Sequence, residues 1–97
     1  MLTGRQRRYL RRLGQRLAPT LHVGRDGVTA GVVEQAETQL GAHELIKIRM
    51  TESTPVSRHE TADELAARTQ AEVVQVLGRT ALLYRERADE PTIVLPT

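Results

Sequence analysis

The stretch Leu21-His22-Val23-Gly24-Arg25-Asp26-Gly27-Val28-Thr29 predicts a strand, a tight turn and a helix start in direct succession. Its apolar, β-branched beginning is typical of a short strand over 20–23. The Gly24-x-x-Gly27 spacing predicts a turn whose backbone another molecule can approach closely. Thr29 is a suitable N-cap for the next helix, and N–H groups at a helix start point outward, toward anions. The stretch therefore predicts a strand–turn–helix unit whose turn is a candidate phosphate-binding loop.

The segment before this stretch is predicted to be a basic amphipathic helix. Thr3 and Gln6 fit a capping box at its start, and Pro19 predicts its end. Leucines at positions 10, 13 and 17 form one apolar stripe, which predicts the buried face. Two rows of arginine cover the other faces: Arg5, Arg8, Arg12 and Arg16 in one row, and Arg7 and Arg11 in the other.

The charge of the chain is unevenly distributed. The formal net charge is only +2, but residues 1–25 hold seven arginines and no acid, whereas residues 26–97 hold seven bases and twelve acids. This asymmetry predicts a polyanion-binding N-terminal part, with a solvated basic helix that has no partner as the alternative. All but one of the 14 basic residues are arginine, which offers planar bidentate donors to phosphate, although genome composition can produce the same bias.

Length and composition limit the class of protein. A chain of 97 residues is expected to form one domain, 1–97, with a modest core. The absence of cysteine excludes disulfides and thiolate metal sites and fits a cytoplasmic protein. No apolar run reaches the roughly 18 residues that a membrane span requires, and the basic N-terminus lacks the apolar core of a signal peptide.

The rest of the chain alternates helices and strands. Residues 44–49 alternate in polarity and place Ile46, Ile48 and Met50 on one face, which predicts a half-buried strand. The resulting order, αβαβαββ, predicts an α/β fold, a two-layer sandwich with a four-stranded mixed sheet. The other predicted helices run from Thr29 to Gly41 and onward from a Ser57/Glu60 capping box. Strands are predicted over 72–77 and 80–85, on either side of a Gly78-Arg79 turn. Residues 93–95 are predicted to form either a short strand or a loosely packed segment.

Six segments, in this order and at this spacing, resemble a known family. They are Leu17-Ala18-Pro19, Val23-Gly24-Arg25-Asp26-Gly27-Val28-Thr29, Gly31-Val32-Val33, His43-Glu44-Leu45-Ile46-Lys47-Ile48, Gly78-Arg79-Thr80-Ala81-Leu82-Leu83-Tyr84-Arg85 and Thr92–Pro96. Each motif alone is unspecific, but the series covers almost the whole chain and resembles the YhbY-like RNA-binding domain, also called the CRM domain. The resemblance implies a fold similar to the C-terminal domain of translation initiation factor three.

The same resemblance implies a non-enzymatic, stand-alone bacterial protein that binds rRNA in large-subunit precursors and assists ribosome assembly. Similar domains occur in group II intron splicing factors of plant organelles. Gly24, Arg25 and Gly27 match the family's loop, which is compared with the backbone-clamping loop of KH domains. Two positions depart from the family pattern. Ala18 replaces the usual lysine before the proline, and Asp26 puts an acid in the loop, where we interpret it as a turn residue that bonds its own backbone.

The predicted partner is therefore RNA, with no membrane, no small-molecule substrate and no cofactor, and the protein is expected to be a monomer. The first helix and the loop are expected to form one surface, because Pro19 turns the chain shortly before the loop. Tyr9 and Tyr84 are the only aromatic residues, so recognition should depend on phosphates and shape more than on base stacking. The predicted RNA-binding residues are Arg5, Arg7, Arg8, Arg11, Arg12, Arg16, Gly24, Arg25, Asp26, Gly27 and Arg79.

The sequence gives little support to other chemistry. The histidines at 22, 43 and 59 lack metal-ligand spacing, and the loop is not a P-loop, because no Gly-Lys-Ser/Thr follows it. Two alternatives stay open. One is a basic protein–protein adaptor, whose binding would survive high salt. The other is an enzyme that acts on a phosphate-bearing substrate through Arg25, which would turn over a nucleotide.

Overall fold

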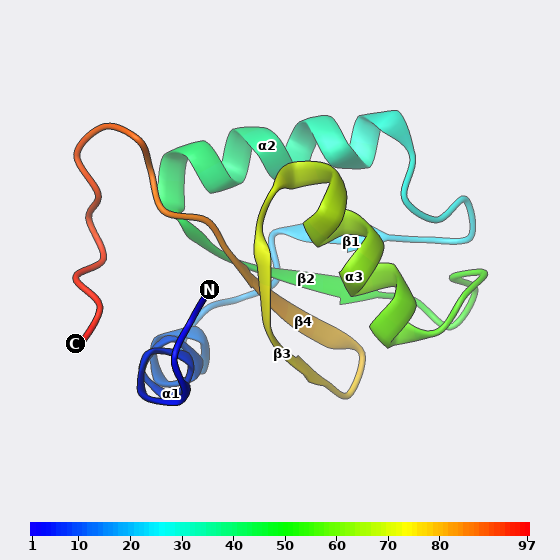
Figure 1. The fold of residues 1–97 in the computed structure, drawn as a ribbon. Coiled ribbons are helices and arrows are strands. Elements are labelled where there is room, and N and C mark those ends of the chain that lie inside the picture. The colour runs from blue at the N-terminus through cyan, green and yellow to red at the C-terminus, as the bar shows by residue number, and fades with distance from the viewer.

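The computed structural model describes residues 1–97 as three helices and a four-stranded sheet (Figure 1). The predicted α/β class and the order αβαβαββ are confirmed. The strand order across the sheet is β1-β2-β4-β3; β1 is parallel to β2, and the other two pairs are antiparallel, so the sheet is mixed. The elements are α1 (Gly4–Gly14), β1 (Leu21–Val23), α2 (Ala30–His43), β2 (Leu45–Met50), α3 (Arg58–Thr69), β3 (Glu72–Leu77) and β4 (Thr80–Tyr84).

Helices cover both faces of the sheet. α2 and α3 pack on one face over the larger core, which contains Ile46, Ile48 and Met50 as the strand alternation predicts. α1 lies on the other face, where Leu10 packs in a smaller core with Leu45 and other residues of the sheet. Figure 1 shows α1 below the sheet and α2 above it, with α3 in front of the strands. The sheet, α2 and α3 form the expected two-layer sandwich. α1 adds a partial third layer, because successive strand residues point to opposite faces and some are apolar on each.

The three predicted N-caps are confirmed. The hydroxyl oxygens of Thr3, Thr29 and Ser57 each accept a hydrogen bond from the backbone N–H three residues further on, at 3.1 to 3.2 Å. The pair of Thr3 and Gln6 forms a complete capping box. These bonds satisfy N–H groups for which a helix has no internal partner, so the short polar side chains fix where each helix begins.

α1 ends earlier than predicted, at Gly14 rather than at Pro19. Leu10 is fully buried, but Leu13 and Leu17 are 36% and 37% exposed, so the leucine stripe is only partly buried. A Cβ atom at Gly14 would lie 2.4 Å from Leu82 Cδ1. The missing side chain therefore lets α1 approach β4 closely, and the low helix propensity of glycine favours an end at this position.

We expect Gly14→Ala to lower the free energy of unfolding by about 1–2 kcal/mol, because the new methyl group overpacks the contact with Leu82. Gly41→Ala is the matched control. Gly41 is also helical but has no atom within 4 Å of a Cβ position, so alanine there should stabilise the protein by up to about 1 kcal/mol. Urea denaturation measures both changes. Equal stabilities of the two variants would contradict the close contact between α1 and β4.

α2 also ends at an unpredicted position. It continues through Gly41 to His43, so Gly41 is not the C′ residue that the sequence indicated. Glu44 follows the helix with a φ of 66° and donates its N–H to the Leu40 carbonyl at 2.9 Å. A non-glycine residue in this conformation is strained, so the fixed contacts of its side chain have to compensate.

The Glu44 carboxylate is fully buried and holds the C-terminal segment. Its Oε2 accepts the N–H of Arg87 at 2.7 Å. Its Oε1 accepts the N–H groups of Thr92 and Ile93 at 2.8 and 2.9 Å, and the Thr92 hydroxyl at 2.9 Å. Burial by itself raises the pKa of this carboxyl, but the hydrogen bonds outweigh burial and hold the pKa below its usual value. Residues 93–95 consequently form no strand; Ile93 and Leu95 pack against the smaller core.

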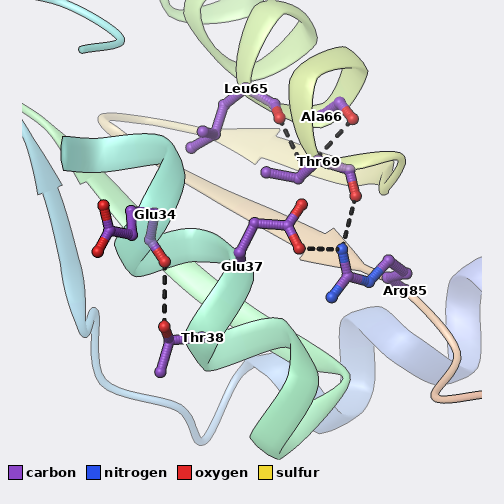
Figure 2. Close-up of polar contacts among 7 residues, drawn as sticks. All are labelled: Glu34, Glu37, Thr38, Leu65, Ala66, Thr69 and Arg85. Carbon is purple, nitrogen blue, oxygen red and sulfur yellow. Dashed lines mark hydrogen bonds and ion pairs between the residues drawn. The ribbon is translucent and has the colours of Figure 1, made fainter. Parts of the chain in front are cut away.

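Arg85 connects the C-terminal parts of α2 and α3, as Figure 2 shows. Its Nη1 donates to Glu37 Oε2 on α2 and to the Thr69 carbonyl at the end of α3, both at 2.8 Å. The buried Thr69 hydroxyl donates to the Leu65 carbonyl at 2.8 Å. The charge of Arg85 is thus paired with the carboxylate of Glu37, whereas no arginine of α1 forms an ion pair.

Candidate nucleic-acid interface

Basic and acidic side chains are unevenly divided between the two faces of the sheet. α1 carries five arginines and no acidic residue. A molecule with this separation of charge presents one side to a polyanion and turns the other away from it. On the opposite face, α2 and α3 expose the two arginines Arg58 and Arg68 but five acidic residues: Glu34, Glu37, Glu60, Asp63 and Glu64.

The arginines of the N-terminal segment fall into two groups. Arg7 is half-buried and donates from Nη1 to the carbonyl of Val73 on β3, which ties α1 to the sheet. Arg5 donates to the terminal oxygen of Thr97 at 3.3 Å. The remaining side chains are free to contact phosphate, because they make no hydrogen bond or ion pair within the protein. These are the half-buried Arg11 and the exposed Arg8, Arg12 and Arg16.

The Gly-x-x-Gly loop is a tight turn at the carboxyl end of β1. The Gly27 N–H donates to the Gly24 carbonyl at 3.0 Å, and Gly27 has a φ of 70°, a conformation that favours glycine. Gly24 has no atom within 4 Å of a Cβ position, so its surface is open to close approach. Arg25 and Asp26 are both exposed. The Asp26 carboxylate does not accept the backbone N–H bond that we expected, and the bond between Gly27 and Gly24 closes the turn.

α1 and this loop are not adjacent. Figure 1 shows α1 beneath one end of the sheet and the loop between β1 and α2 at the other end. The neighbour of the loop is the segment between β2 and α3, since a Cβ on Gly27 would lie 3.5 Å from Pro55 Cγ. The prediction that α1 and the loop form one continuous surface is therefore wrong. The strand between them carries the chain away from α1 before the loop begins.

An uncovered part of the sheet lies between these two features. α1 packs mainly over β2 and β3 and leaves β1 open on this face. His22 on β1 is paired in register with Arg49 on β2, and both residues are exposed. Their strand neighbours Leu21, Val23 and Ile48 face the larger core, so alternation places His22 and Arg49 on the α1 side.

Lys47 belongs to the same face, two residues before Arg49 on β2. It is half-buried and makes no ion pair. The open basic face, defined as His22, Lys47 and Arg49, thus extends from α1 toward the loop. These residues were not in the predicted set. The signal that indicates Lys47 and Arg49 is their alternation with the buried Ile46, Ile48 and Met50.

Arg79 lies in the turn between β3 and β4, at the same end of the sheet as the loop. Its guanidinium forms an ion pair with Glu52, and both side chains are exposed. The hydrogen bond from Arg79 and then its charge lower the pKa of the Glu52 carboxyl. Arg79 is therefore locally compensated, whereas Arg25 makes no ion pair.

The two tyrosines offer little stacking surface. Tyr9 is half-buried, as expected, and Tyr84 is buried more deeply, with no hydrogen-bond partner for its hydroxyl. Burial, with the nearby charges of Glu44, Glu86 and Glu72, raises the pKa of Tyr84. No cluster of histidine and acidic side chains could hold a metal ion. None of the three helices is long and apolar enough to cross a membrane.

Comparison with known proteins identifies the family. The model of the CRS1 / YhbY (CRM) domain matches residues 2–85. The chain is 34% identical over 96 residues to the Bacillus subtilis (strain 168) protein named "Probable RNA-binding protein YqeI", with 99% of this chain and 100% of the relative covered. It is 36% identical over 85 residues to the Pseudomonas aeruginosa protein named "Probable RNA-binding protein PA4753", with 88% and 82% covered.

The fold has a close counterpart among solved structures. The solution structure of the protein SAV1595 from Staphylococcus aureus superposes with a TM-score of 0.84 at 35% sequence identity, and covers 99% of this chain and 100% of that chain. The family model spans all of the helices and strands, and the match to the Bacillus subtilis relative covers 99% of this chain and 100% of the relative. The chain is therefore a member of the CRS1 / YhbY (CRM) domain family.

Proposed function

We propose that this protein is a non-enzymatic, cytoplasmic RNA-binding protein that binds rRNA in precursors of the large ribosomal subunit and assists their assembly as a monomer. The observation that carries the proposal is the set of basic side chains on the α1 side that no acidic group of the protein neutralises. The RNA-binding names of the relatives support the class of partner.

RNA contact is proposed at three places on the molecule. Arg8, Arg11, Arg12 and Arg16 of the N-terminal segment would bind phosphates, with Arg5 and Arg7 beside them. The open basic face would continue this path across β1 and β2. At the far end, the loop residues 24–27 would approach the backbone closely, next to Arg79. Such contacts fix the RNA through its phosphates, which gives affinity with little base reading.

Salt titration tests the arginines directly. Each phosphate contact releases condensed counterions, so log affinity should fall linearly with log salt, by about 0.7 per contact on single-stranded RNA. Arg8→Ala and Arg12→Ala should each weaken binding to all sequences and flatten this slope by roughly one contact. Both residues are exposed, so the melting temperature should stay nearly unchanged.

Arg58→Ala is the matched control, because Arg58 is an exposed arginine on α3, on the opposite face of the sheet. It should leave the slope as it is in the parent protein. If Arg8→Ala and Arg12→Ala also leave the slope unchanged, α1 is only a solvated face. If the protein instead binds another protein and this binding persists at high salt, the adaptor function is favoured.

The ribosomal part of the proposal needs a cellular measurement. In sucrose gradients of cell lysates, the protein should sediment with large-subunit precursors at low salt and be released at high salt. Cross-linking followed by sequencing of the bound RNA should recover large-subunit rRNA. If the protein is recovered only among free proteins at low salt, the assembly role is contradicted. RNA binding itself is then judged by the salt titration alone.

A further inference from the structure

An apolar groove of about 460 Å³ opens beside the C-terminal end of α1. Leu13 and Leu17 form part of its wall and are each more than a third exposed. α1 ends at Gly14, between these two leucines, and both stay partly uncovered. The other apolar residues of the wall are Ala18, Leu45, Ile46 and Ile93.

The polar side chains at the groove are positive or neutral. Lys47 and His43 line it, and neither makes a hydrogen bond or an ion pair within the protein. Glu44 stands between them in sequence, but its carboxylate is turned to the C-terminal segment and fully bonded there. No acidic side chain lines the groove. Its charge therefore complements a polyanion.

The groove is also continuous with the surface proposed to bind RNA. Lys47 belongs both to the groove and to the open basic face. The unpaired Arg12 and Arg16 directly precede Leu13 and Leu17 in the chain. A strand of RNA whose phosphates lie on these arginines would pass the mouth of the groove. Its bases are then the apolar groups nearest to the exposed leucines.

We propose that this groove binds an unpaired nucleobase of the RNA, an inference that rests on the proposed function. The leucine side chains would cover the face of the base, while Lys47 and His43 donate hydrogen bonds to its edge. The volume lies within the range of ligand pockets, about 300–1,000 Å³, and is sufficient for a base and part of its ribose. A base in this groove must be free of its pairing partner, so the groove confers a preference for single-stranded RNA although no aromatic side chain lines it.

The test compares Leu17→Ser with the parent protein on two probes: a single strand of mixed sequence of about 12 nucleotides and the same strand in an RNA duplex. Leu17→Ser should weaken single-strand binding about five- to tenfold and leave duplex binding nearly unchanged. The salt slope should stay at the parent value, because no phosphate contact is lost. Leu13→Ser should behave in the same way. Leu77→Ser is the matched control, since Leu77 is an exposed leucine at the end of β3, away from the groove.

The outcomes separate this proposal from the proposed function. Suppose that Leu17→Ser and Leu13→Ser bind the single strand as well as Leu77→Ser does. The groove then does not bind a base. The RNA-binding function still stands if the slope of log affinity against log salt depends on Arg8 and Arg12. An equal loss on both probes would also overturn the base site. If the parent protein shows no salt-dependent binding to RNA at all, the proposed RNA-binding function is wrong, and the base site is wrong with it. Sedimentation of the free protein adds one more check: a dimer that Leu17→Ser abolishes would show that a second copy occupies the groove.

Discussion

Glu44→Ala should lower the free energy of unfolding by about 3 kcal/mol, because it removes a buried charged acceptor that serves four hydrogen bonds. Bonds to an ionised acceptor contribute roughly 1.5–3 kcal/mol each, so a simple sum would be larger. The C-terminal segment can detach locally and rehydrate its N–H groups, which limits the loss. Chemical denaturation measures the effect, and hydrogen exchange should show faster exchange at Arg87, Thr92 and Ile93.

Glu44→Gln separates the charge of this side chain from its shape. One amide oxygen can still accept hydrogen bonds, but the NH₂ group would face a backbone N–H that also donates, so an intermediate loss is expected. Thr92→Val provides the smaller reference change, because it removes the hydroxyl bond alone at an otherwise exposed residue. If Glu44→Ala cost no more than Thr92→Val, the buried carboxylate would not be an anchor of the C-terminal segment.

The stability that Glu44 provides should depend on pH in a defined direction. The folded state lowers the pKa of this carboxyl below its usual 4.5, so the ionised form favours the folded protein. The contribution is fully present above that value and is lost as the pH falls through the lower folded-state pKa. The difference in stability between the parent and Glu44→Gln should therefore shrink on acidification below about pH 4.5. The Glu52 carboxyl titrates in both proteins, so it does not affect this difference.

Gly27→Val should produce the largest loss of RNA affinity among the single substitutions, about 30-fold, or roughly 2 kcal/mol. A β-branched residue is strongly disfavoured at the φ of 70° that Gly27 adopts, so the turn has to change shape. The rearranged loop would lose its backbone contacts to phosphate. The slope of log affinity against log salt should change little, since the arginines remain. The same strain should cost about 1–3 kcal/mol of stability, which melting curves report.

Gly24→Val distinguishes close approach from strain at the loop. Gly24 has no positive φ and no neighbour within 4 Å of a Cβ position, so a side chain there fits the free protein. We expect Gly24→Val to keep the parent melting temperature and still weaken RNA binding, because the added methyl groups hold the RNA backbone away. If Gly24→Val binds RNA as well as the parent does, the loop does not contact the RNA closely. The role of the loop would then be limited to the turn that Gly27 forms.

Local signals in the sequence were sufficient for most of the fold. Capping by Thr3, Thr29 and Ser57 follows from neighbouring residues, and so does the strand alternation of Ile46, Ile48 and Met50. These features depend on bonds and periodicities within a few residues, which a sequence contains directly. Helix ends were less predictable. Gly14 packs closely on Leu82, and Glu44 is held by the C-terminal segment; these partners are far from the helix ends in the chain.

By itself, the sequence determined the element order, the turn at residues 24–27 and the excess of arginine in the first 25 residues. Only the tertiary structure decided which of these arginines are free, since the Arg7 side chain reaches a carbonyl on β3 while the Arg12 side chain makes no hydrogen bond or ion pair. It also separated α1 from the loop and placed His22, Lys47 and Arg49 on the strands between them. The physical reason is that charge and periodicity are properties of the chain, whereas the neighbours of a side chain depend on which face of the sheet each helix covers.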